Sequence, residues 1–527
     1  MLRIYNIPVA LDKKDESLKS IVSNYLKIST KSIKSAILFK SSIDARKKDN
    51  IHFIYCIDVE LSNEDNILKL VDKKVEKISP YTYTIQKCKF LDKRPLVVGF
   101  GPAGMFAALI LAQAGQYPIV IERGCDIDAR TKDVYEFWNN RNLKIDSNVQ
   151  FGEGGAGTFS DGKLNTGIKD LRCRKVLEEF VSCGAPKESL YVAKPHIGTD
   201  KLKATVKNLR NKIISLGGEV KFGTKLVEIL HSKGTIQGAV VESNGNKYEI
   251  ITNNIILSIG HSARDTFKMI HNIGVDLKQK PFSVGVRIEH LQSMINDSQY
   301  GKFAKHPALG LANYKLAIHL KNGRGVYTFC MCPGGSVVSA SSESGMVVTN
   351  GMSEFARDKI NANSAVLVGL NPGDFEDDNP LTGVEFQRRI ERNAFILGGE
   401  NYNAPVQRLE DFLNDKVTNN LGDVCPSYKP GYKFANLSLL FPEYITSSLR
   451  MGIVEMDRYL KGFADRDTIL TGPETRSSSP IRITRDVSKQ SISLKGLYPC
   501  GEGAGYAGGI ISAAVDGISC AESIIYK

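Results

Sequence analysis

The sequence predicts an α/β protein made of three parts, and three observations support this prediction. A buried strand, a glycine-rich turn and an apolar helix follow one another over residues 95–114. A second strand, turn and helix of the same kind occupy residues 496–521. Residues 1–90 show a β-α-β-β-α-β order of apolar patterns. We therefore expect a parallel sheet covered by helices, a domain inserted between its two halves, and a small N-terminal α+β domain.

The N-terminal segment predicts a separate domain at residues 1–92. Its strands and helices show alternating or helical spacing of apolar residues and are expected at residues 2–9, 17–26, 33–39, 52–59, 66–75 and 83–90. This order is typical of a ferredoxin-like βαββαβ fold. Residues 91–95 are the expected linker to the next domain.

The glycine motif at residues 99–104 predicts a dinucleotide-binding site of the Rossmann type. Gly99 permits a tight turn, Gly101 lets a pyrophosphate approach the backbone, and Gly104 allows the helix to pack closely on the strand. A second strand at 117–121 ends in Glu122, where a carboxylate can bind ribose hydroxyls. The residues expected here are Gly99, Gly101, Pro102, Ala103, Gly104, Glu122 and Arg123.

The C-terminal motif distinguishes FAD from NAD(P). Residues 496–521 resemble the second signature of FAD enzymes related to the fumarate reductase and glutathione reductase groups. In that pattern Glu502 lies by the ribityl–pyrophosphate linkage, and the helix that begins near Gly509 points its positive end at the flavin ring. The residues expected to bind are Gly501, Glu502, Gly508, Gly509 and Ile510.

Two further segments fit an FAD domain, which we place at residues 93–275 and 466–527. Residues 225–259 alternate as a small meander and end at Gly260, and Val227 resembles the position whose backbone contacts adenine. Residues 150–167 hold six glycines, whose N–H groups could reach the flavin; the alternative is a flexible surface loop. The residues expected to bind in this loop are Gly154, Gly155, Ala156 and Gly157.

With these motifs, almost the whole chain resembles the uncharacterised FAD-dependent dehydrogenases of the fumarate-reductase-like superfamily. The resemblance rests on residues 151–163, 194–200, 260–265, 327–335, 349–353, 474–480 and 500–506. It implies bound FAD and a dehydrogenase activity, and it leaves the substrate open.

The candidate catalytic residues are His196, His261, Lys163 and Arg476. Both histidines lie in glycine-containing loops and have a side chain that titrates near neutrality, although a lone histidine in a loop is more often structural. Lys163 is an ionisable group of the glycine loop, and Arg476 could hold an anionic small-molecule substrate or be structural.

Residues 276–465 carry no nucleotide motif and predict an inserted α+β substrate or cap domain, with strands at 282–288, 315–319 and 326–332 and a helix at 361–368. Such a cap would exclude water from a reduced flavin. We expect no metal site, because no Cys/His cluster has zinc spacing. Cys330 and Cys332 are interpreted as buried small residues, with a redox pair as the alternative.

Composition bears on partners and compartment. Ten cysteines without regular spacing indicate reduced thiols in a cytoplasmic protein, and no stretch predicts a membrane span. Residues 1–94 carry 19 Lys and Arg against 12 Asp and Glu; scattered lysines make nucleic-acid binding the weaker interpretation. Without a second G-x-G-x-x-G motif, NAD(P)H is expected only as a transient reductant.

The sequence therefore predicts an FAD-dependent oxidoreductase that transfers hydride between an unidentified substrate and flavin N5. One alternative is a flavoprotein that acts on or binds RNA through its basic N-terminal domain. The other is a non-catalytic flavin redox sensor. The sequence leaves the direction of electron flow and the oligomeric state open.

Overall fold

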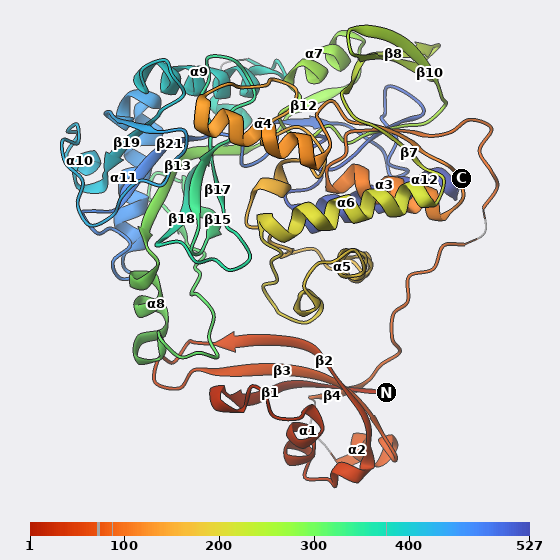
Figure 1. The fold of residues 1–527 in the computed structure, drawn as a ribbon, viewed down its shortest axis with the longest axis vertical. Coiled ribbons are helices and arrows are strands. Elements are labelled where there is room, and N and C mark those ends of the chain that lie inside the picture. The colour runs from red at the N-terminus through yellow and green to blue at the C-terminus, as the bar shows by residue number, and fades with distance from the viewer. Residues whose placement is uncertain (71–73, 87, 376, 527) are drawn as a thin grey trace.

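The computed structural model describes residues 1–70, 74–86, 88–375 and 377–526 (Figure 1). It confirms the mixed α/β class, with one parallel sheet and several antiparallel or mixed ones. Figure 1 shows the N-terminal domain as a separate body at the lower end of the molecule. Within the described residues, no helix has both the length and the apolar character needed to cross a membrane.

The N-terminal domain is a four-stranded antiparallel sheet in the order β2-β3-β1-β4, with both helices on one side (Figure 1). Its elements are β1 (Leu2–Ala10), α1 (Leu18–Leu26), β2 (Ile33–Asp44), β3 (His52–Leu61), α2 (Glu64–Leu70) and β4 (Val75–Lys77). Element order and strand order are those of a ferredoxin-like unit.

The predicted last strand at residues 83–90 is wrong. The fourth strand is β4, and residues 71–73 of the predicted helix 66–75 lie outside the described residues. Residues 83–86 and 88–90 form no strand, and their apolar side chains pack on the core of the next domain. Tyr83 Oη donates to Glu522 Oε1 at 2.8 Å. The alternating pattern therefore reflects docking of an extended segment on another domain.

A five-stranded parallel sheet in the order β23-β11-β5-β6-β7 forms the centre of the second body. The strands are β5 (Leu96–Val98), β6 (Ile119–Ile121), β7 (Glu219–Lys221), β11 (Ile255–Leu257) and β23 (Leu497–Pro499). An antiparallel meander of β8 (Thr224–Ser232), β9 (Thr235–Ser243) and β10 (Asn246–Ile251) accompanies it.

Alternation along β5 explains how the sheet is covered on both faces. Leu96 and Val98 share a core with Ile229 of the meander. Val97 shares a core with Phe106 of α3 (Pro102–Gln113) and with α12 (Ile510–Ile525). α3 and α12 lie next to each other, and a Cβ at Gly517 would stand 2.1 Å from Ala103 O, so the helices meet without room for a side chain.

A seven-stranded mixed sheet forms the third body, in the order β14-β15-β18-β13-β21-β19-β20. The strands are β13 (Phe282–Leu291), β14 (Ala317–His319), β15 (Gly325–Cys332), β18 (Asn361–Leu370), β19 (Ala404–Arg408), β20 (Tyr432–Phe434) and β21 (Ile469–Glu474). Because β21 comes from beyond residue 465, the sheet extends past the predicted end of the insertion; the domain limits themselves stay predictions.

The predicted helix at residues 361–368 is wrong, because these residues belong to β18, an interior strand of the sheet. β13 and β15 pair with β18 on its two sides, and almost every one of its residues is buried. A short apolar run that is buried on both faces has no period that separates helix from strand.

The remaining elements are two short antiparallel ladders and the helices that surround the sheets. They are β12 (Leu277–Gln279) with β22 (Ile481–Ile483), β16 (Ser336–Ser339) with β17 (Thr349–Met352), and α4 (Ile127–Asn140), α5 (Arg172–Ser182), α6 (Thr199–Ser215), α7 (Arg264–Asn272), α8 (Gln292–Tyr300), α9 (Thr382–Leu397), α10 (Leu409–Leu413) and α11 (Glu443–Met456).

Candidate functional site

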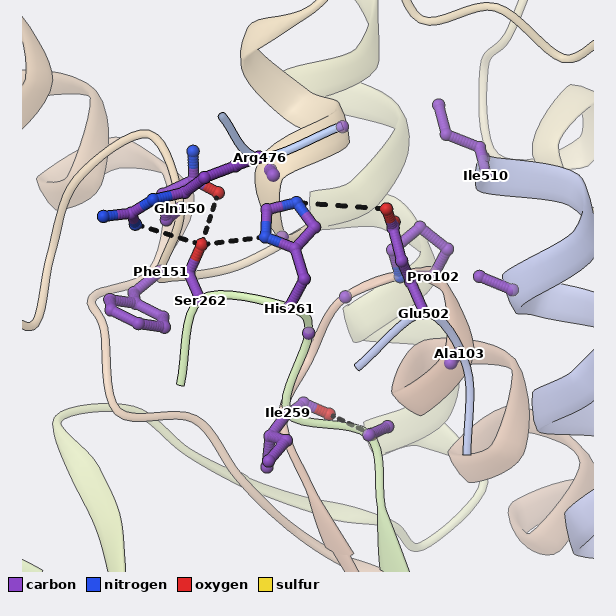
Figure 2. A pocket seen from close by; sticks show the side chains of 18 of the residues that line it. Pro102, Ala103, Gln150, Phe151, Ile259, His261, Ser262, Arg476, Glu502 and Ile510 are labelled. Atoms are coloured by element: carbon purple, nitrogen blue, oxygen red, sulfur yellow. Dashed lines mark hydrogen bonds and ion pairs between the residues drawn. The ribbon is translucent and has the colours of Figure 1, made fainter. Parts of the chain in front are cut away.

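A cavity of about 350 Å³ lies where the carboxyl ends of the parallel strands meet the seven-stranded sheet. It extends from β8 past the N-termini of α3 and α12 to residues of β15, β17 and β21. Open α/β sheets bind their ligands outside the carboxyl ends of the strands. Figure 2 shows the part of this cavity around His261.

Glycines keep one side of the cavity free of side chains. Gly260, Gly508 and Gly509 line it, and a Cβ added to any of them would meet no protein atom within 4 Å. At Gly99, which has φ +94°, a Cβ would stand 2.4 Å from Ser258 O. This cradle suits a ligand that approaches the backbone closely, as a dinucleotide does.

Two helix N-termini open on the cavity without a side-chain cap. α3 begins after Gly101 and α12 after Gly509, and at neither end does a capping side chain accept from the helix N–H groups. Uncapped N–H groups and the positive end of the helix dipole attract anionic groups. The residues present therefore fit a dinucleotide with a pyrophosphate at α3 and a flavin near α12.

Glu122 lies at the end of β6 and lines the cavity, but its carboxylate is already bonded. It accepts N–H bonds from Phe100 at 2.8 Å, from Gly124 at 2.9 Å and from Gly152 at 3.0 Å. These bonds tie three loops to one side chain. The role of Glu122 toward a ribose stays a prediction, and its observed role is to hold the glycine turns in place.

Arg123 also lines the cavity, close to the meander. Its guanidinium lies 4.4 Å above the Phe151 ring and donates to Asp265 Oδ1 at 3.0 Å. The Arg123 side chain is therefore held in place on the cavity wall. It lies at the end of the cavity that Leu226 of β8 also lines.

The structure brings fourteen of the eighteen residues predicted to bind the cofactor to the cavity wall. They are Gly99, Gly101, Pro102, Ala103, Glu122, Arg123, Gly155, Ala156, Gly157, Gly260, Glu502, Gly508, Gly509 and Ile510. The other four, which do not line the cavity, are Gly104, Gly154, Val227 and Gly501.

Three of these four fall where the chain packs on itself. A Cβ at Gly104 would stand 1.9 Å from Gly99 O, and one at Gly154 would stand 2.0 Å from Thr158 Oγ1. At Gly501 a Cβ would stand 2.8 Å from Ala103 Cβ. These glycines allow the turns that form the cavity.

Val227 is adjacent in the chain to Leu226, which does line the cavity. The pairing of β8 with β9 shifts register between Leu226 and Glu228, so Val227 lies in an irregularity of the strand. A resemblance between strands does not locate such an irregularity.

His261 lies at the centre of a hydrogen-bond chain in the cavity (Figure 2). Ser262 Oγ donates to Gln150 Oε1 at 3.1 Å and accepts from Arg476 at 3.2 Å. Its contact with His261 Nδ1 at 2.9 Å is therefore one in which the imidazole donates. This assigns the proton to Nδ1 and leaves Nε2 as an acceptor, 3.9 Å from Glu502 Oε1.

The structure changes which of these groups titrates near neutrality. Burial, with the nearby Arg476 and Arg264 charges, lowers the pKa of His261 to about 3. Burial raises the pKa of Glu502 to about 7. The expectation that His261 titrates near neutrality is therefore wrong. His261 is a neutral acceptor, and Glu502 is the group that gains or loses a proton near pH 7.

Arg476 reaches the cavity from the segment after β21, but its charge is shared with a buried network. Arg264 and Arg476 both donate to the carboxylate of Glu391, which is fully buried. Arg264 also donates to Glu343 at 3.2 Å, so two carboxylates face the two guanidinium groups of this network. Arg476 as a substrate clamp stays a prediction.

Lys163 lines the cavity and His196 does not. Lys163 Nζ lies 3.5 Å from Asp161 Oδ2 and makes no hydrogen bond within the described residues. The two backbones pair in an isolated antiparallel bridge, but the His196 ring stacks on Phe355 with 5.2 Å between ring centroids. The two residues are neighbours whose side chains have different surroundings.

Side chains of the cavity wall that were missed as site residues include Gln150 and Ser262 of the hydrogen-bond chain, and Cys330, Asn350 and Glu474. The last three come from β15, β17 and β21, and each belongs to a sequence block that carried the family resemblance. Those blocks were the signal available for them. Only the pairing of distant strands brings the three together.

Cys500, Asp516 and Cys520 form a group whose ligand atoms lie within 4.8 Å of one another. Arg485 donates to both oxygens of Asp516, at 2.6 and 2.9 Å. A guanidinium therefore already occupies the position of a cation, which disfavours a metal ion there.

Comparisons with known proteins identify matches to family models and to a relative. Residues 281–477 match a family model described as "FAD-dependent protein, C-terminal domain-like", and residues 1–60 match a domain of unknown function, DUF8436. A protein of Clostridium beijerinckii (strain ATCC 51743 / NCIMB 8052), described as uncharacterized, is 49% identical over 530 residues. The match covers 100% of this chain and 99% of that protein.

Solved structures of flavoenzymes are weakly similar to this chain. The flavin-dependent brominase Bmp2 has a TM-score of 0.38 at 10% identity, covering 82% of this chain and 79% of that chain. A glycine oxidase from Bacillus cereus has a TM-score of 0.35 at 11% identity, covering 82% and 95%. Scores this low carry no argument about function.

Proposed function

The chain belongs to a family of FAD-dependent proteins and has FAD as its cofactor, and we propose that it is a dehydrogenase that transfers hydride between a small substrate and the flavin. The observation that carries this proposal is the two-sided cavity. One side offers glycine backbone and two helix N-termini, and the other offers ionisable side chains. The substrate would bind between the flavin and the seven-stranded sheet.

The cofactor would lie along the glycine side. The N-terminus of α3 would hold the pyrophosphate, and the loop at residues 155–157 and the N-terminus of α12 would hold the flavin end. FAD supplies two-electron hydride chemistry when bound. The protein supplies orientation, exclusion of water and proton transfer.

His261 and Glu502 would accept and release the proton that accompanies hydride transfer. Nε2 of His261 is a neutral acceptor that faces Glu502 across 3.9 Å. Glu502 has a pKa raised to about 7, so it can hold a proton at Oε1 and release it at physiological pH. Ser262 and Gln150 fix the imidazole in one orientation.

Lys163 would bind an anionic group of the substrate. Arg357 already donates to both oxygens of Asp161, so the nearby ammonium is not needed to neutralise that carboxylate. Lys163 Nζ makes no hydrogen bond within the part of the chain that the structure describes. A buried ammonium with free donors favours an anionic ligand.

We propose a cytoplasmic location from the cysteine pattern of the sequence. The ten cysteines lack the regular spacing of a disulfide framework. Thiols persist in reducing compartments, whereas secreted proteins tend to pair them.

An anaerobic titration of the FAD-loaded protein with NADH and NADPH, followed by the flavin's visible absorption, tests the proposal. Bleaching by one nucleotide would identify it as the reductant, bound transiently because the sequence holds no second dinucleotide motif. A flavin that neither nucleotide reduces would require an organic hydride donor. A flavin that no hydride donor reduces, although dithionite does, would contradict a dehydrogenase.

A further inference from the structure

We propose that Cys330 and Cys332 are a redox-active pair on the cavity wall, which exchanges two electrons with FAD by cycling between a disulfide and two thiols. The proposal rests on the proposed function, because the pair needs a flavin that is reduced and reoxidised in this cavity. It gives the protein a second two-electron centre beside the cofactor.

The backbone of β15 presents the pair to the cavity. Cys330 lines the cavity, and Cys332 is fully buried behind it. The pairing of β15 with β18 shifts register between Phe329 and Cys332. Within this irregularity Cys332 Sγ donates to Cys330 O at 3.3 Å. The Cys332 thiol therefore lies against the backbone of Cys330, two residues before it in the chain.

Cys330 also has an unusual conformation for a residue other than glycine. Its φ is +46°, in the left-handed region. Arg287, which is fully buried, donates to Cys330 O at 3.0 Å and so helps to hold that conformation. Backbone held in a sparsely populated region is concentrated at functional sites.

The surroundings of Cys330 favour a thiolate. The neighbouring Cys332 thiol lowers the pKa of Cys330 well below its usual range, and the positive charges of Lys163 and Arg287 add to the effect. Lys163 lines the same cavity. Reactive cysteines lie in partly exposed, electropositive surroundings of this kind, with a resolving cysteine beside them.

Cys500 provides a contrast within the same cavity. It also lines the wall and has a cysteine neighbour, Cys520. Burial raises the pKa of Cys500 well above its usual range, and Cys520 adds to that rise. Cys500 is also fully buried, and Arg485 Nη1 donates to Cys520 Sγ at 3.6 Å, whereas Cys330 is only partly buried. Cys330 is therefore the more accessible thiol of this wall.

The exchange balances with the flavin as the only other reactant. Two electrons and two protons leave the reduced FAD, the Cys330–Cys332 S–S bond breaks, and two S–H bonds form. The FAD is oxidised as the disulfide is reduced. In the reverse direction the two cysteines lose two electrons to FAD and the S–S bond forms. Two thiols give up two protons to the flavin; where Cys330 is already a thiolate, the cysteines give up one proton and the second comes from solvent.

Anaerobic dithionite titration of the oxidised, FAD-loaded protein tests the pair by counting electrons. The wild type is expected to take up about four electron equivalents per FAD, because a disulfide is a two-electron couple. Cys332→Ser and Cys330→Ser are expected to take up about two. Cys425→Ser, which changes an exposed cysteine, should keep the wild-type count.

Mass spectrometry after thiol alkylation gives a second measurement that does not depend on activity. In the oxidised wild type, the peptide with both cysteines should carry no label and be two hydrogens lighter. After reduction it should carry two labels. This measurement uses only the wild type, so it decides the question even where a serine variant fails to fold.

Two electron equivalents in the wild type, with both cysteines labelled in the oxidised protein, would overturn the pair. That result leaves the dehydrogenase proposal intact if a nicotinamide nucleotide still bleaches the flavin. Four equivalents with a flavin that no hydride donor reduces would instead overturn the dehydrogenase and retain the pair.

Discussion

The parallel sheet and the seven-stranded sheet meet at one cavity but build their sides of it by different means. Strands of three residues, such as β5 and β6, end in glycine turns that offer backbone N–H groups. Strands of eight and six residues, β15 and β21, offer the side chains of Cys330 and Glu474. A site for a common cofactor can be made of backbone, whereas a site for a particular substrate needs side chains.

The two sides also differ in how their charges are held. On the glycine side, the Glu122 carboxylate is satisfied by three backbone N–H groups. On the other side, Arg287 Nε of β13 donates to Glu474 Oε2 of β21 at 2.8 Å, and the two residues are 187 positions apart in sequence. The first arrangement is local, and the second depends on the whole sheet. Substitutions on the glycine side should therefore lower FAD affinity, whereas substitutions on the other side should lower the stability of the fold.

The largest effect is expected from Arg287→Met. Arg287 is fully buried and donates to Glu474, Asn363 and Cys330 O. Its removal leaves a buried carboxylate without a partner and should lower the free energy of unfolding by about 3–5 kcal/mol. Urea denaturation of the FAD-loaded protein measures the loss.

Arg324→Met is the matched control for this change, because Arg324 pairs with Asp374 where both side chains keep some exposure to solvent. This substitution should lower the free energy of unfolding by at most about 1 kcal/mol. Equal losses for the two variants would mean that the ion pair at Arg287 does not organise the sheet.

The next effect is expected on the glycine side, from Gly508→Val. A side chain at Gly508 meets no protein atom but enters the cavity, so folding should be preserved and FAD should be excluded. We expect FAD affinity to fall by about tenfold or more, which is about 1.4 kcal/mol or more. Flavin fluorescence during titration of the apoprotein measures the affinity.

Gly373→Val is the control for the glycine side, since a Cβ there also meets nothing and the residue lies away from the cavity. It should bind FAD as the wild type does. Unchanged FAD binding in Gly508→Val would show that the flavin does not run past α12.

The same contrast between local and long-range contacts decides which features could be predicted from the sequence. The two glycine turns, the strands that precede them and most of the N-terminal element order follow from the local spacing of residues, which the sequence shows directly. The last strand of the N-terminal domain and the strand β18 were mistaken because burial on another element, rather than local spacing, set their apolar patterns.

The same limit applies to the site. Glu502 and Gly508 lie in a motif, so their place at the cavity could be predicted. The lowered pKa of His261 could not be predicted. Arg264 lies within four residues of His261 in sequence, but Arg476 lies more than two hundred residues away. Only folding brings both charges close to the buried imidazole ring. Electrostatics of a buried group depends on tertiary neighbours.

The third prediction concerns pH and uses Glu502→Gln. With a pKa of about 7, the Glu502 carboxyl is mostly protonated below pH 7 and mostly ionised above it. If the protonated form serves hydride transfer, the rate of flavin reduction should follow the protonated fraction and fall about fivefold from pH 7 to pH 8, and about sixteenfold from pH 7 to pH 8.5. Stopped-flow absorption measures it. Glu502→Gln should give a flat profile.

Glu385→Gln is the control for the pH profile, because Glu385 is an exposed residue of α9 and its pair with Arg388 lies outside the cavity wall. It should keep the wild-type slope. A slope that persists in Glu502→Gln would assign the titration to another group and would remove Glu502 from the proton path.

The smallest effect is expected from His196→Phe, set against the same change at His261. The His196 ring stacks on Phe355 and Nε2 contacts Phe355 O at 3.2 Å, away from the cavity wall. Phenylalanine can keep the stacking and loses one hydrogen bond, worth about 1 kcal/mol of stability. Flavin reduction should stay within about twofold of wild type, whereas His261→Phe should slow it by about a hundredfold or more. Equal slowing by both changes would mean that the proton path runs from the seven-stranded sheet through the Lys163 loop to His196, and that the cavity wall alone does not define the active site.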